Sequence, residues 1–184
     1  FTSVQLLIQK IGSHIENLVL SIFNDELRRK LFDIIIDFCE KIKFLHLVHV
    51  DAMNISQLSS MISSFNNYLK YLTLEIKFND FFYFYNSHDD LEVSSMILKE
   101  LSTSSLPSSL HYLDLNLGFN PDELQIFFEN CKQVGLKKLL IRNYSKYMVD
   151  TILKVVKEFV KEKNLEFLAY QFQYSIAQDD VRHE

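Results

Sequence analysis

Residues 110–117 read Leu-His-Tyr-Leu-Asp-Leu-Asn-Leu, and the spacing of the leucines in this stretch decides the fold. The first six residues follow the order apolar, two of any kind, apolar, one of any kind, apolar. The second half alternates, as a β-strand does when one of its faces is buried and the other is open. Five further segments share this pattern, and they begin at Ile15, Ile42, Leu69, Leu136 and Leu165. Four of the five distances between the starts of successive segments are 26–29 residues, and the third distance is 41 residues. Such regular spacing indicates a structural repeat.

Between the predicted strands, apolar residues recur at the helical spacing of three and four. Residues 120–123 read Asn-Pro-Asp-Glu and predict a helix start, because Asn caps, Pro suits the first turn and Glu follows three residues after the cap. Asn54 and Asp89 are predicted to cap two other helices, and residues 3–12 to form a helix before the first strand. The stripe that predicts a further helix consists of Leu27, Leu31, Ile34, Ile35 and Phe38.

Strands that alternate with helices over so short a repeat lie parallel and are joined by right-handed crossovers. Two architectures fit this order of elements: a doubly wound sheet with helices on both faces, or a solenoid with every helix on its outer side. Doubly wound strands are apolar on both faces, whereas one face here carries polar residues such as Thr73 and Arg142. The sequence therefore predicts an α/β solenoid with about six parallel strands on the concave face and helices on the convex face. We expect a solenoid domain over residues 1–175, with an insertion at about 78–90 and a polar tail at 176–184.

These repeats resemble leucine-rich repeats of the long, ribonuclease-inhibitor-like class, over about residues 3–173. The family places Asn or Cys three positions after the third apolar residue, and this sequence departs from that rule. The residues found there are Phe23, Val50, Lys77, Gly118, Tyr144 and Gln173. The segments LKYLTLEI, LPSSLHYLDLNL and FENCKQVGLKKLLIRNY also resemble the repeat region of fungal F-box proteins, which select substrates for a ubiquitin ligase. The resemblance implies the substrate-recognition half of such a protein, because no Leu-Pro-rich segment that would dock an adaptor is visible in the sequence.

Composition narrows the function further. Of 184 residues, 48% are apolar, which excludes a disordered chain, and no apolar run is long enough to span a membrane. The net charge of −5 argues against nucleic acid or an anionic membrane as the main partner. Cys39 and Cys131 are predicted to be buried, reduced thiols, which suits a cytoplasmic or nuclear location.

No catalytic motif appears in the sequence. The six histidines form no metal-binding spacing, and three glycines cannot build a phosphate-binding loop. We therefore expect a protein that is not an enzyme and needs no cofactor or metal. The rival from another class is a nucleotide-using α/β enzyme, which would need a glycine-rich turn after a strand.

The candidate binding residues come from the third position of each segment and, for Arg142, from the seventh position; both positions project from the open strand face. Adjacent strands bring this row together, and aromatic and arginine side chains are enriched at interfaces. The alternatives are that ring contacts merely stiffen the sheet, or that the insertion, with six aromatics between 78 and 90, binds the partner. A non-enzymatic scaffold or sensor domain is the alternative function within the binding class. The predicted protein-binding residues are Phe44, Tyr71, Tyr112, Lys138, Arg142 and Phe167.

Overall fold

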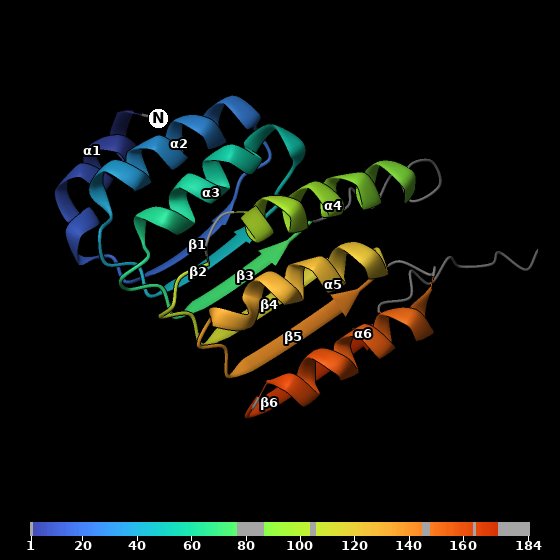
Figure 1. Cartoon of the computed structure of the whole chain (residues 1–184). Coiled ribbons are helices and arrows are strands. Elements are labelled where there is room, and N and C mark those ends of the chain that lie inside the picture. The colour runs from blue at the N-terminus through green and yellow to red at the C-terminus, as the bar shows by residue number, and fades with distance from the viewer. Residues whose placement is uncertain (1, 77–86, 104–105, 145–147, 164, 173–184) are drawn as a thin grey trace, which may run out of the picture.

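The computed structural model describes residues 2–76, 87–103, 106–144, 148–163 and 165–172 (the side chains of 87–90 and 133 excepted), and strands alternate with helices throughout them (Figure 1). The strands are β1 (Asn17–Ser21), β2 (Phe44–Val48), β3 (Tyr71–Glu75), β4 (Tyr112–Leu117), β5 (Lys138–Asn143) and β6 (Phe167–Phe172). The α-helices are α1 (Thr2–Ile11), α2 (Asp25–Phe38), α3 (Ile55–Ser64), α4 (Ser87–Thr103), α5 (Pro121–Asn130) and α6 (Val149–Glu162). Short 3-10 turns are η1 (Gly12–His14), η2 (Ala52–Asn54) and η4 (Cys131–Gln133).

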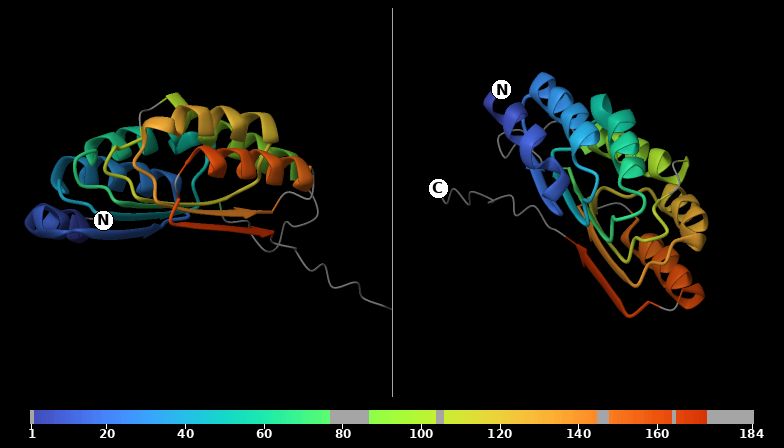
Figure 2. Two further views of the ribbon diagram at one scale, coloured as in Figure 1. Left: turned by 60° about the horizontal axis from the view of Figure 1, so that its bottom comes forward. Right: turned by 90° about the vertical axis from the view of Figure 1, so that its left-hand side faces the viewer.

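The six strands form one parallel sheet in the order of the chain, β1-β2-β3-β4-β5-β6. The register follows the repeat without a slip, so Leu45, Leu72 and Leu113 are neighbours on successive strands. Figure 2 shows α2 to α6 side by side over one face of the sheet. We call the other face the open face. The predicted parallel α/β order is confirmed, and the described helices do not cover both faces as a doubly wound sheet would require.

The core lies between the sheet and the helices. On β2 to β5, the leucines of the inner strand rows, such as Leu72 and Leu139, are fully buried, and each such burial contributes about 1.5–3 kcal/mol. On the helix side, the rings of Phe128 and Phe159 stack with their centroids 4.1 Å apart, which joins α5 to α6. Cys39 and Cys131 are buried free thiols, as expected. Among the described helices, none has the length and apolar character needed to cross a membrane.

Two predicted caps differ from the structure. Asn120 accepts a hydrogen bond from the Asp122 amide at 3.0 Å, as predicted. Asn54 precedes α3 but makes no capping bond; Asp51 instead accepts from the Met53 amide at 2.9 Å and starts the turn η2. Asp89 lies inside α4, which begins at Ser87. Most of the predicted insertion at 78–90, and the polar tail at 176–184, lie outside the described residues.

The predicted core face of α2 is confirmed in the middle of the helix, where Ile34 and Ile35 are buried, but not at its start. Leu27 is 40% exposed, whereas the buried row runs through Arg28, Phe32 and Ile35. Arg28 is buried at the start of the helix, and its guanidinium points inward. It donates to the Ile22 carbonyl at 3.2 Å and also to the His49 carbonyl, the Asp25 carboxylate and the Asp51 carboxylate, which ties together the turns after β1 and β2.

Candidate functional site

The third-position row is assembled on the open face as the sequence predicted. The residues that stand opposite one another on successive strands are Asn17, Phe44, Tyr71, Tyr112, Lys138 and Phe167. The ring centroids of Phe44 and Tyr71 lie 6.5 Å apart, and those of Tyr71 and Tyr112 lie 6.0 Å apart. We call these three rings the aromatic row.

The aromatic row is open to solvent in its middle. Tyr71 is 43% exposed, while Phe44 and Tyr112 are half-buried. Burial, and to a lesser extent the negative charge of Asp114, raise the pKa of the Tyr112 phenol, so this hydroxyl stays protonated. Phe167 is exposed too, but Lys138 on β5 separates it from the three contiguous rings. The site therefore presents apolar ring surface together with the hydroxyl groups of its two tyrosines.

Arg142 does not present the free positive charge that the sequence suggested. Its Nε and Nη2 atoms donate to the two carboxylate oxygens of Asp114 at 3.0 and 2.9 Å. The side chains of this pair are only 19% and 9% exposed. Lys138, which stands opposite Tyr112 on the next strand, is exposed and has no ion pair among the described residues. Whether either residue binds a partner stays a prediction.

A second pair lies beside the first. His46 Nε2 is 3.5 Å from Glu75 Oε2, on the neighbouring strands β2 and β3. Burial is the main cause that raises the pKa of Asp114; Arg142 and His46 lower it, and Glu75 raises it. The four side chains thus form one polar group across β2 to β5, which we call the polar cluster. Sequence reasoning missed it, although the signal was present as polar residues at the fifth and seventh positions of the central segments.

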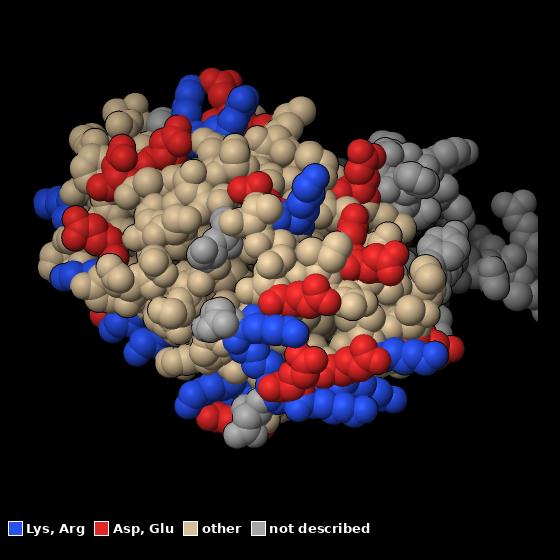
Figure 3. Space-filling view, viewed as in Figure 1, with Lys and Arg blue, Asp and Glu red and all other residues tan. Residues whose placement is uncertain are grey.

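The molecule offers no deep ligand pocket among its described residues. An enclosed cavity next to Arg28 and Phe32 holds about 10 Å³, which is the least that a single water needs. A shallower hollow of about 60 Å³ lies between α5 and α6, near Glu129 and Glu158. No three metal-ligating side chains gather in the part of the chain that the structure describes. On the helix side, basic and acidic residues are interspersed (Figure 3).

Comparison with known proteins adds no family. No protein-family model matches this chain, and neither a curated protein nor a solved structure matches it significantly. The functional argument therefore rests on the open face.

Proposed function

We propose that this chain is a leucine-rich-repeat solenoid whose open, concave face binds a protein. The proposed role is substrate recognition for a ubiquitin ligase of the F-box type, within the cytoplasm or nucleus. The observation that carries the proposal is the aromatic row, because its three contacting rings on adjacent strands leave apolar surface open to solvent.

The physical argument concerns where binding free energy concentrates. Interface hot spots are enriched in Tyr and Arg, which bury a large area for few torsions fixed, and they cluster at the centre of an interface. Tyr71 and Tyr112 lie on β3 and β4, the two central strands of the sheet. The absence of a deep pocket among the described residues also favours a broad protein surface over a small molecule as ligand.

Alanine substitution in the aromatic row tests the proposal. We expect Tyr71→Ala or Tyr112→Ala to weaken binding of a partner identified from cell extract by about 2 kcal/mol, with little loss of stability. Tyr68→Ala is the matched control, because Tyr68 is 42% exposed, close to the 43% of Tyr71, but lies in the turn before β3. If the Tyr71 and Tyr112 variants unfold instead, the rings only stiffen the sheet.

The ligase role has a separate test. A partner that is a ligase substrate should persist longer in cells that express Tyr71→Ala than in cells that express the unchanged protein. An unchanged half-life, with binding lost, would favour the scaffold or sensor function. If deletion of residues 78–86 abolishes binding while the tyrosine variants keep it, the insertion is the binding element.

A further inference from the structure

Two hydrogen-bond acceptors lie next to each other at the carboxyl end of the open face. Glu75 and Asn116 occupy matching positions on β3 and β4, so their backbones are one strand spacing apart, about 4.8 Å. Asn116 is only 6% exposed, and its Oδ1 atom has no hydrogen-bond partner in the described part of the chain. A buried acceptor without a donor is unfavourable, so this position favours a ligand that supplies one.

The neighbouring cations do not supply that donor. The guanidinium of Arg142 is turned to Asp114, with both Nε and Nη2 engaged. His46 Nε2 approaches Glu75 only to 3.5 Å. The Asp114 carboxylate is thus paired with the guanidinium, whereas the Glu75 carboxyl group contacts no lysine or arginine among the described residues. The Glu75 side chain is 21% exposed, so a ligand on the open face can reach it.

We propose that Glu75 and Asn116 together bind a lysine or arginine side chain of the protein partner. This inference rests on the proposed function of the open face. An ammonium or guanidinium group carries several donors and no acceptor, so it can satisfy the Glu75 carboxylate and the Asn116 carbonyl at once. Such a charge-assisted contact is stronger than a bond between neutral groups, and it would give the Glu75 carboxylate a cationic partner.

The aromatic row sets where this cation lies in the partner. Glu75 follows Tyr71 by four residues on the same strand, a separation of about 13 Å at the rise of a strand. An extended partner segment that runs along β3 would thus carry its basic residue about four positions from the residue that covers the rings.

The exposed lysines make a weaker case for an acidic partner. Lys70 and Lys138 lie at the starts of β3 and β5, but both are exposed. Neither lysine lies beside a buried, unpaired polar atom of the described residues, whereas Glu75 lies beside Asn116.

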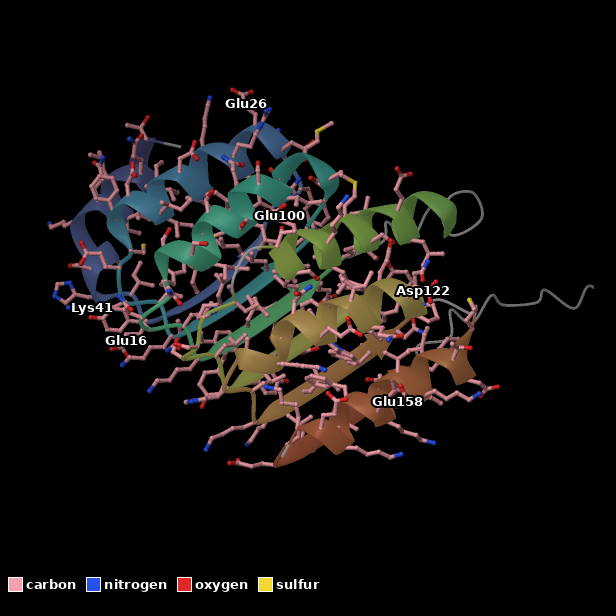
Figure 4. The ribbon with its side chains drawn as sticks, viewed as in Figure 1. Glu16, Glu26, Lys41, Glu100, Asp122 and Glu158 are labelled. Atoms are coloured by element: carbon pink, nitrogen blue, oxygen red, sulfur yellow. The ribbon has the colours of Figure 1, made fainter. Side chains whose placement is uncertain are left out.

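Selection of peptides by the full chain tests the inference. The probe is a displayed library of short random peptides, and we expect the enriched sequences to share a Lys or Arg at one fixed position. A synthetic version of the selected peptide should bind Glu75→Gln at least about tenfold more weakly than the unchanged protein. The control is Glu158→Gln, which removes an exposed carboxylate from α6, on the helix side of the molecule (Figure 4). This variant should bind the peptide as tightly as the unchanged protein.

Replacement of the peptide's basic residue by norleucine completes a double-mutant cycle. We expect the norleucine peptide to bind the unchanged protein as weakly as the original peptide binds Glu75→Gln. The norleucine peptide should bind Glu75→Gln little more weakly than either single change alone would produce. Peptides without a fixed cation, or with equal affinity for Glu75→Gln, overturn the inference; if they still lose binding in Tyr71→Ala, the proposed function stands. A library that yields no peptide dependent on Tyr71 counts against both.

Discussion

Arg142 on β5 and Asp114 on β4 form a bidentate ion pair on the open face, with N–O distances of 3.0 and 2.9 Å. This geometry uses the planar fork of the guanidinium, which a lysine cannot reproduce. The pair is mostly buried, because the Asp114 side chain is 9% exposed. The partial loss of water around the carboxylate explains why burial outweighs the guanidinium and raises the pKa of Asp114 above its usual 3.8.

This raised pKa predicts how stability depends on pH. A group that binds its proton more tightly in the folded state stabilises that state as pH falls from the folded pKa towards the unfolded value. We therefore expect the free energy of unfolding of the unchanged protein, relative to Asp114→Asn, to increase as the pH falls from neutral towards 3.8. Urea denaturation of both proteins across this range measures the difference. A difference that shrinks on acidification would show that Arg142 dominates.

Arg28 is expected to need its full guanidinium. It is 3% exposed and donates to two turn carbonyls and two carboxylates, which an ammonium group cannot reach simultaneously. Arg28→Lys keeps the charge but leaves some of these acceptors without a donor, so it should lower the free energy of unfolding by about 1–3 kcal/mol. Arg29→Lys, at the exposed neighbouring position, is the control and should change stability by less than about 0.5 kcal/mol. Equal effects of both substitutions would mean that the Arg28 contacts contribute little.

The strand register predicts opposite outcomes for two adjacent residues. Leu72 is fully buried on the helix side of β3, whereas Tyr71 points to the open face and is 43% exposed. Leu72→Asp should abolish cooperative unfolding, because an unpaired charge in the core costs several kcal/mol of a small total stability. Tyr71→Asp should remain folded, as judged by circular dichroism and thermal melting. A folded Leu72→Asp protein would contradict the register.

The sequence predicted the backbone better than the side-chain contacts. The alignment of Leu45, Leu72 and Leu113 on successive strands could be predicted, because strand periodicity follows from the pattern of apolar residues alone. The inward position of Arg28 could not, since it depends on carbonyl groups of two turns that lie far apart in the sequence. The pairing of Arg142 with Asp114 depends likewise on contacts between strands, although Arg142 was assigned to the correct face.

Gly12 is expected to tolerate no side chain. A Cβ atom at this position would stand 2.5 Å from the Phe38 carbonyl oxygen, so the backbone where η1 meets the end of α2 would have to move. Gly12→Ala should destabilise the protein by about 1–3 kcal/mol in chemical denaturation. Gly135→Ala provides the comparison, since its Cβ would lie 3.1 Å from the Ser108 carbonyl oxygen, and we expect a smaller loss. The reverse order would contradict the packing at η1.

The edge strand β1 predicts self-association of the protein. On one side β1 pairs with no other strand of the described sheet. Val19 on β1 and Leu6 and Leu7 on α1 are more than half exposed. An uncharged edge strand is a template for pairing, and a lysine on it prevents that pairing. In sedimentation experiments at high protein concentration, Val19→Lys should therefore associate less than the unchanged protein. Thr151→Lys, on an exposed position of α6, should leave association unchanged; equal behaviour of all three proteins would refute the prediction.

The strand order has a consequence for how the molecule loses structure. Because chain order and sheet order coincide, each strand pairs only with the units next to it in sequence. Leu72 on β3 is fully buried, whereas Leu168 on β6 is 37% exposed, so the terminal unit is held less firmly. Amide hydrogens of β6 should exchange with solvent through local fraying, long before those of β3 and β4. A molecule that has transiently lost its last unit would still carry the aromatic row intact.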